Sequence, residues 1–223
     1  MRPEVVLWDW DNTLVDGWAG IRAALNVVFS AHGLPEWSHE ETRARVRKSL
    51  KATFPDLFGA DWQAAVTEFR VALAKVHLDH LRPMPGALAM LRASAGLPQG
   101  VVSNKEGRFL RMEVAHLGLN EAFRAVVGAG DAAADKPDPA PILHALTAMR
   151  VTPGRGVWYI GDTGVDMRAA HAAGCTAVLL GDAAHDGGVG ALAARGAAPH
   201  LHFIDAFTGA KEMSARILDA SVR

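Results

Sequence analysis

The sequence contains a single cysteine, so no internal disulfide can stabilise the chain, and Cys175 is a free thiol. Its setting in AHAAGCTAVLL predicts a buried and unreactive side chain. An excess of one charge is also missing, because 23 lysines and arginines oppose 24 aspartates and glutamates, for a net charge of -1. The chain therefore lacks a long-range field that would attract nucleic acid or an anionic membrane, and we expect a small-molecule partner.

Long hydrophobic runs are absent as well. The N-terminal stretch MRPEVVLW places an arginine, a proline and an acid before a short apolar run, which fits neither a secretory signal nor a membrane span. We therefore expect a cytoplasmic location. Half of the 223 residues are hydrophobic and 21% are charged, which is typical of a folded globular chain with a sizeable core.

Short, nearly continuous apolar runs recur along the chain and alternate with helical stretches. Strands that are buried on both faces have this character, and the alternation predicts βαβ units. We therefore expect an α/β fold, a Rossmann-like parallel sheet with helices on both faces. The expected strands are Val5–Trp10, Gly100–Ser103, Ala125–Val127, Val157–Ile160, Ala177–Leu180 and, more weakly, His202–Ile204.

The long segment between the first strand and Pro83 contains no strand signal, which is far more than one βα connection needs. Its helical periodicity predicts an inserted, all-helical subdomain over residues 16–83, and a core formed by residues 1–15 and 84–223. Ser38 and Glu41 have the spacing of a capping box within this insert. The insert also carries a run of cations, which is typical of a solvated helix face or of a surface for an anionic substrate: Arg43, Arg45, Arg47, Lys48 and Lys51.

Two carboxylates, Asp9 and Asp11, end the first apolar run, VVLWDWDNTL. Ionised groups beside a buried strand are costly unless a metal, a cation or a substrate compensates them, so the pair indicates a site. In an open parallel sheet, the residues that follow each strand converge at one edge. The polar residues expected at that edge are Asp9, Asp11, Ser103, Asn104, Lys136, Asp162 and Asp166, an inventory suited to phosphate and Mg²⁺. Each has an alternative interpretation as a turn, cap or solvated loop residue.

Four segments, DWDNTL, VVSNK, DKPDPAP and GDTGVD, occur in an order that resembles the four motifs of the haloacid dehalogenase superfamily of phosphohydrolases. The likeness runs nearly end to end. Between the motifs, LRMEVAHLGL, AFRAVVGAGD and RAAHAAGCTAVLL resemble the phosphoglycolate-phosphatase-like branch, in which the helical insert has the position of a cap domain.

The resemblance implies that Asp9 is the nucleophile, forming a phosphoaspartyl intermediate, and that Asp11 transfers protons. It implies Mg²⁺ as the cofactor, held by Asp9, the backbone carbonyl of Asp11, and Asp162. Asp166 would orient a metal-bound water or pair with Lys136. The implied phosphate-binding residues are Thr13, Ser103, Asn104 and Lys136.

The sequence departs from the commonest family pattern at Asn12, where many members have glycine. Asparagine tolerates unusual backbone angles, so we expect the turn to survive. The acid at Asp11 disfavours halide displacement and favours a small phosphorylated metabolite as substrate. A phosphomutase of the β-phosphoglucomutase kind shares these motifs, and a non-catalytic phosphate-binding module is a third possibility. The sequence does not identify the substrate.

Overall fold

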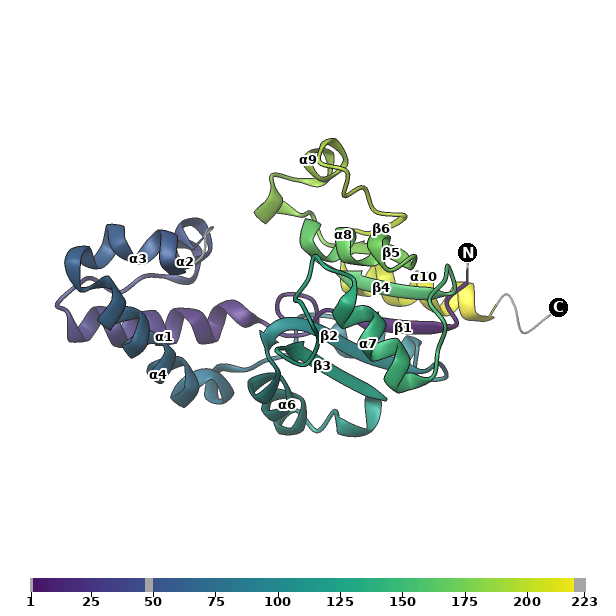
Figure 1. The fold of residues 1–223 in the computed structure, drawn as a ribbon, viewed down its shortest axis with the longest axis horizontal. Helices are drawn as coiled ribbons and strands as arrows, with labels where there is room; N and C mark the ends of the chain where they lie inside the picture. Colours follow the sequence, from purple (N-terminus) through teal and green to yellow (C-terminus); the bar gives the residue numbers. More distant parts are fainter. Residues whose placement is uncertain (1, 47–49, 219–223) are drawn as a thin grey trace. The chain divides into compact units, whose positions relative to one another are not determined.

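The computed structural model describes residues 2–46 and 50–218, without the side chains of residues 50–53 (Figure 1). The chain divides into two compact units, one formed by Met1–Val15 and Pro83–Arg223 and the other by Asp16–Arg82. The first unit resumes at Pro83, one residue before residue 84, where the sequence predicts the chain to return to the core. Pro83 belongs with the first unit because Val15 forms a bridge with it and the Met84 N–H donates to the Leu14 carbonyl.

The first unit is built on a six-stranded, fully parallel sheet with the strand order β3-β2-β1-β4-β5-β6. The predicted α/β fold is therefore confirmed. The chain moves outward from β1 to one side through β2 and β3, and then to the other side through β4, β5 and β6. The crevice between the carboxyl ends of β1 and β4 is thus the topological switch point, where ligands bind in open sheets of this kind. The strands are β1 (Val5–Trp8), β2 (Gln99–Glu106), β3 (Ala125–Ala129), β4 (Val157–Gly161), β5 (Thr176–Leu180) and β6 (Leu201–Phe203).

Helices cover both faces of this sheet, because neighbouring residues of the buried strands point to opposite sides. Tyr159 belongs to a core that includes Ile142 and Met167. On the other face, Trp158 packs against Phe203, and Arg216 lies over the Trp158 ring. The helices of this unit are α5 (Ala87–Ala93), α6 (Gly107–His116), α7 (Ala140–Met149), α8 (Gly164–Ala172), α9 (Val189–Ala194) and α10 (Ala206–Leu218), with short 3-10 turns η2 (Asn120–Ala122) and η3 (Ala184–Asp186).

Two strands differ at their ends from the apolar runs that predicted them. β1 stops at Trp8 rather than Trp10, because the Trp10 carbonyl accepts from the turn that follows, from the Leu14 N–H at 2.9 Å and the Val15 N–H at 3.1 Å. β2 continues to Glu106 through a polar segment, since Glu106 pairs with Ala129 after a register shift that begins at Val102. The expected buried thiol of Cys175 is confirmed.

The second unit contains helices in its described residues, as the missing strand signal predicts. They are α1 (Gly17–Ala31), α2 (His39–Arg45), α3 (Leu50–Phe58), η1 (Gly59–Asp61) and α4 (Trp62–His80). Leu25 and Phe29 of α1 pack with Phe54 and Phe69 in a separate apolar core. The unit therefore has a core of its own, as an independently packed insertion requires.

The capping box at the start of α2 is confirmed, with both reciprocal bonds between Ser38 and Glu41 present. Within the predicted cation run, Arg45 pairs with Glu41 at 3.4 Å and lies over the Trp37 ring, 4.9 Å from its centroid. Arg47 and Lys48 lie outside the described residues, as does the side chain of Lys51. Among the helices that the structure describes, none combines the length and apolar character needed to cross a membrane.

Candidate active site

Lys136 is the centre of the candidate site. It lies in the loop between β3 and α7, yet only 6% of its surface is exposed. Its Nζ donates to Asp9 Oδ1 at 2.6 Å, to Asp166 Oδ1 at 2.7 Å and to the Tyr159 hydroxyl at 2.7 Å. Tyr159 in turn donates to the carbonyl oxygen of Val102 at 2.8 Å. All three ammonium hydrogens thus have partners, and the charge is fixed in place.

Asn104 fixes the backbone of this lysine. Its Oδ1 accepts from the Lys136 N–H at 2.9 Å, and its Nδ2 donates to the Lys136 carbonyl at 2.8 Å. The irregular segment of β2 that follows Val102 turns Asn104 toward the loop. Ser103, next to it, is buried, and its hydroxyl accepts the N–H of Lys105 at 3.1 Å.

Asp166 is held by the start of α8. Thr163 is the N-cap of that helix, and Asp166 Oδ2 accepts from its N–H at 3.1 Å and from its hydroxyl at 2.6 Å. Gly161 leaves the room that this carboxylate needs, since a Cβ there would lie 2.5 Å from Asp166 Cγ. The end of β4 therefore delivers Asp162 and Asp166 to the same edge as Asp9.

Three carboxylates gather at this edge. Asp9, Asp162 and Asp166 each offer one oxygen, and these oxygens lie within 4.8 Å of one another. The Thr13 hydroxyl lies between two of them, 3.3 Å from Asp9 Oδ2 and 3.4 Å from Asp162 Oδ1. A tight turn brings Thr13 back to this position through Asn12, whose φ of 63° is left-handed. The predicted survival of the turn with asparagine is thereby confirmed.

Burial disfavours the ionised form of two carboxylates in this cluster, Asp9 and Asp162, and so raises their pKa values. Burial raises the pKa of Asp9 to about 7, although the nearby Lys136 charge lowers it, and the charge of Asp166 raises it further. Burial likewise raises the pKa of Asp162 well above its usual range, again with the charges of Asp166 and Asp9 adding to the effect. For Lys136, burial alone would lower the pKa, but Asp166 and Asp9 outweigh it and hold the pKa well above the ordinary value.

The donor set fits a divalent cation. Three carboxylates against one ammonium leave an excess of two negative charges when all are ionised, and hard oxygen donors are the ligands of Mg²⁺. Asp9 Oδ2 and Asp162 Oδ1 have only the long contacts with the Thr13 hydroxyl and can turn to such an ion, whereas both oxygens of Asp166 accept from closer donors, Lys136 and Thr163. The Asp11 carboxylate is outside this cluster, so any contribution from Asp11 falls to its backbone carbonyl.

Asp11 belongs to a second charged group. Its Oδ1 accepts from Lys105 Nζ at 2.7 Å, and the same ammonium donates to both oxygens of Glu113, at 2.8 and 2.6 Å. The two acids that follow β1 are therefore held by different lysines. Burial opposes the charge of Lys105, but Asp11 and Glu113 outweigh it and raise the pKa of the ammonium.

The structure thus brings together Asp9, Thr13, Lys136, Asp162 and Asp166, with Asn104 and Ser103 beside them. Sequence reasoning missed Tyr159, Lys105 and Glu113. Tyr159 is the only tyrosine in the sequence, and a lone hydroxyl within the apolar run VWYIG was its signal. Lys105 was visible as the last letter of VVSNK, but Glu113 resembles any other helical acid.

Comparisons with known proteins agree with this geometry. The family model described as "Haloacid dehalogenase-like hydrolase" matches residues 6–180. A Pseudomonas aeruginosa protein named N-acetylmuramic acid 6-phosphate phosphatase is 33% identical over 78% of this chain and 80% of its own length. A Chromobacterium violaceum phosphoglycolate phosphatase is 29% identical over 80% of this chain and 85% of its own.

Solved structures show the same fold. A haloacid dehalogenase superfamily hydrolase from Ehrlichia chaffeensis aligns with a TM-score of 0.65 and 25% identity, covering 97% of this chain and 98% of the other. A subfamily IA hydrolase of the same superfamily from Geobacter sulfurreducens aligns with a TM-score of 0.70 and 21% identity, covering 95% and 96%.

The sheet, its switch point and the acidic cluster together define an α/β protein whose candidate site lies at the carboxyl ends of parallel strands. The chain belongs to the haloacid dehalogenase-like hydrolase family. Its relatives are named as phosphatases, which places it in the class of phosphoric monoester hydrolases. The predicted family and enzyme class are therefore confirmed.

Proposed function

We propose that this enzyme is a Mg²⁺-dependent phosphatase that hydrolyses a small phosphorylated metabolite through a phosphoaspartyl intermediate at Asp9. The observation that carries the proposal is the contact of Lys136 with Asp9 and Asp166, 2.6 and 2.7 Å away, beside Asp162. The carboxylate oxygens, which lie within 4.8 Å of one another, could hold a divalent ion, and the lysine places a fixed positive charge next to the attacking oxygen. The names of the relatives support a phosphate monoester as the substrate.

In the first step, a carboxylate oxygen of Asp9 attacks phosphorus, and the bond between phosphorus and the leaving oxygen breaks. Asp11 gives a proton to that leaving oxygen. In the second step, Asp11 takes a proton from a water whose oxygen attacks the phosphorus of the acyl phosphate. The bond to Asp9 then breaks, which releases inorganic phosphate and restores both carboxyl groups.

Phosphoryl oxygens are bound by donors that the site leaves available. The Ser103 hydroxyl accepts from the Lys105 N–H, so its own hydrogen is left for a phosphoryl oxygen. The Asn104 side chain is occupied by the Lys136 backbone, so we assign phosphate binding by Asn104 to its N–H group. We assign two further roles: the Thr13 hydroxyl, which contacts Asp9 and Asp162, turns to a phosphoryl oxygen, and Lys136, whose hydrogens are already bonded, contributes through its charge. Both interactions strengthen as negative charge develops on the phosphoryl group.

We assign the metal to Asp9, Asp162 and the backbone carbonyl of Asp11. When bound, Mg²⁺ supplies Lewis-acid neutralisation of the phosphoryl charge. Asp166 positions Lys136 rather than the ion. The helical unit, predicted over residues 16–83, is proposed to act as a cap that excludes bulk water during the reaction. The single free cysteine suits a reducing compartment, and we propose a cytoplasmic location.

The test is phosphate release from an aryl phosphate by the purified protein with Mg²⁺ and with a chelator. We expect activity with Mg²⁺ alone and its loss in Asp9→Asn. Asp11→Asn should lower kcat by about 10² to 10⁴-fold, because Asp11 must activate the water that hydrolyses the acyl phosphate whatever the leaving group. Turnover that persists in Asp9→Asn would refute the covalent mechanism.

A panel of phosphorylated metabolites, ranked by kcat/KM, then identifies the substrate class. It includes phosphoglycolate and N-acetylmuramic acid 6-phosphate, the compounds named for the relatives. Reaction in oxygen-labelled water separates hydrolysis from the alternative, a phosphomutase. Hydrolysis places the label in inorganic phosphate, whereas transfer to a second sugar hydroxyl yields unlabelled sugar phosphate.

A further inference from the structure

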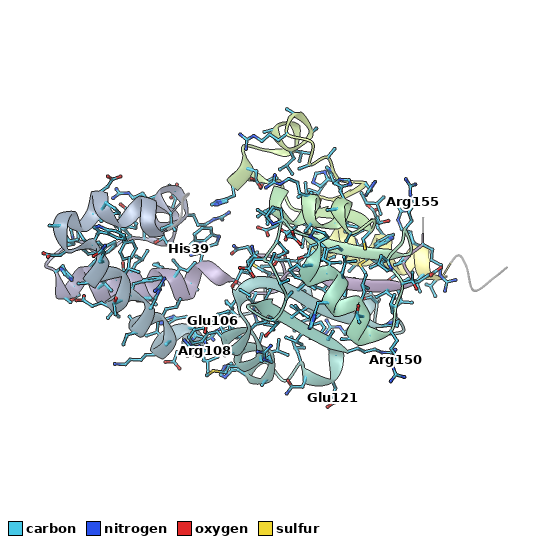
Figure 2. All side chains as sticks on the ribbon, viewed as in Figure 1. His39, Glu106, Arg108, Glu121, Arg150 and Arg155 are labelled. Atoms are coloured by element: carbon cyan, nitrogen blue, oxygen red, sulfur yellow. The ribbon has the colours of Figure 1, made fainter. Side chains whose placement is uncertain are left out.

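The ion-pair network around Lys105 is not used by the mechanism described above. Lys105 is in the last residues of β2, directly before the start of α6, where Glu106 and Arg108 form an exposed pair (Figure 2). Its ammonium lies 2.7 Å from Asp11 Oδ1 and 2.6 Å from Glu113 Oε2. Lys105 is therefore the link between the proposed acid and base and a second carboxylate, on α6.

Glu113 is a buried acid on α6, one of the helices that cover the sheet. Its side chain is only 1% exposed, against 31% for Asp11. In addition to the bonds from Lys105, the Glu113 carboxylate accepts the indole N–H of Trp10 at 2.6 Å. Trp10 is fully buried and lies between Asp9 and Asp11 in the sequence. One carboxylate of α6 thus holds the residue before Asp11 directly and the Asp11 side chain through Lys105.

Stability does not account for this arrangement. A buried ion pair pays a large desolvation penalty, and well-packed apolar residues of similar size usually serve a fold as well or better. A buried acid placed two hydrogen bonds from Asp11 therefore indicates a contribution to the site. The contacts provide orientation, since Asp11 lies beyond the end of β1, directly before the tight turn at residues 12–14, and the ladder of β1 does not hold it.

We propose that Lys105 and Glu113 are positioning residues, which hold the Asp11 carboxyl in the orientation needed to protonate the leaving oxygen. This inference rests on the proposed phosphatase function. Neither residue is assigned a contact with the phosphoryl group, since the Lys105 ammonium already bonds Asp11 and Glu113. Glu113 fixes Lys105, and Lys105 fixes Asp11, so the effect of both reaches the reaction only through Asp11.

The dependence on the leaving group distinguishes positioning from general structural damage. An alkyl phosphate has a poor leaving group that requires the proton from Asp11, whereas an aryl phosphate with an acidic phenol requires it far less. A misplaced Asp11 therefore slows the alkyl substrate selectively. The measurement is kcat/KM for both substrates, which reports the steps through phosphorylation of Asp9.

The main variant is Lys105→Met/Glu113→Gln, which removes both charges and leaves no buried carboxylate without its counter-ion. We expect kcat/KM for the alkyl phosphate to fall about 10²-fold, as for a misplaced catalytic group, and at most about tenfold for the aryl phosphate. Lys105→Arg, which keeps the charge, should recover part of the loss. Arg111→Met is the matched control, because it removes an exposed ion pair of the same helix, to Asp131.

A second comparison uses the Asp11→Asn background. If Lys105 and Glu113 act through Asp11, adding Lys105→Met/Glu113→Gln to Asp11→Asn changes kcat/KM by less than about threefold, since coupled residues are not additive. A full 10²-fold loss in that background overturns the proposal, as does an equal loss for both substrates in the double variant. If the wild-type enzyme is active and either of these results is found, only the positioning role is refuted. If the wild-type protein has no phosphatase activity, the proposed function itself is refuted.

Discussion

Replacing Lys136 by methionine tests the electrostatic basis of the site. The ammonium lies 2.6 Å from Asp9 and 2.7 Å from Asp166, and its side chain is 3% exposed. At an effective dielectric constant of about 20, each contact represents roughly 6 kcal/mol of Coulomb attraction, before the cost of removing the charges from water. Removal of one partner from a buried pair has a net cost of about 3–5 kcal/mol, because it leaves charge uncompensated.

The expected cost depends on pH. Lys136 has a raised pKa, so its stabilising contribution is complete below the unfolded value of about 10.5 and is constant between pH 5.5 and 8. Asp9 has a pKa raised to about 7, so it is ionised at pH 8 and neutral at pH 5.5. Without the lysine the pKa of Asp9 rises further, so within this range the variant differs from the wild type in protonation only between pH 7 and 8. Metal-free Lys136→Met should therefore lose about 5 kcal/mol of unfolding free energy at pH 8, and about 1.4 kcal/mol less than that at pH 5.5.

Urea unfolding in the presence of a chelator, at both pH values, measures this loss. Thermal scans should show a decrease in Tm on the order of 10 °C at pH 8. The control is Arg111→Met, since the exposed pair with Asp131 contributes at most about 1 kcal/mol. Its cost should not change between the two pH values. A Lys136→Met protein that is as stable as this control at pH 8 would show that the ammonium does not compensate the buried acids.

Three further results are expected. Mg²⁺ should raise Tm more at pH 8 than at pH 5.5 in a thermal-shift titration, because Asp9, with a pKa of about 7, must lose its proton to bind the ion; equal shifts would argue against Asp9 as a ligand. Asn104→Ala, which removes both side-chain bonds to the Lys136 backbone, should lower kcat about tenfold with a stability loss under about 3 kcal/mol, measured by steady-state kinetics and urea unfolding. Asn12→Val should cost about 1–3 kcal/mol in urea unfolding, and Asn12→Gly about 0.5 kcal/mol or less, because φ is 63° there; equal costs would contradict the argument from backbone strain.

The fold could be predicted largely because both faces of the sheet are covered. Strands such as Val157–Gly161 are buried along their whole length, so they read as continuous apolar runs. The ends of strands were harder to predict. Trp10 is apolar but lies outside β1, because its carbonyl accepts from the turn that follows, and the polar residues up to Glu106 remain in β2 because β3 lies alongside.

The order of the strands in the sheet could not be predicted from the sequence, because apolar runs identify strands but not which strands pair with each other. That order decides which loops meet. Lys136 reaches Asp9 across 127 positions of sequence, and only the placement of β1 beside β2 and β4 makes the contact possible. The convergence of strand ends could be predicted in general terms, whereas particular partners such as Tyr159 could not.

Glu113 illustrates what periodicity cannot reveal. Its place in LRMEVAHLGL, among residues of mixed polarity, is compatible with an exposed helix face. The side chain is buried because Trp10 and Lys105 approach from two different strand ends and satisfy both of its oxygens. A charge can be buried only where such partners converge, and convergence is a property of the tertiary structure.

Two lysines divide the acids of the site into groups with different surroundings. Lys136 holds Asp9, which is 6% exposed, among buried groups, whereas Lys105 holds Asp11, whose side chain is 31% exposed. A nucleophile benefits from removal from water, which would otherwise solvate the attacking oxygen, while an acid and base must exchange protons with water in every turnover. Chemically identical residues two positions apart can thus take different proposed roles, because the strand ends that surround them supply different cations and different access to solvent.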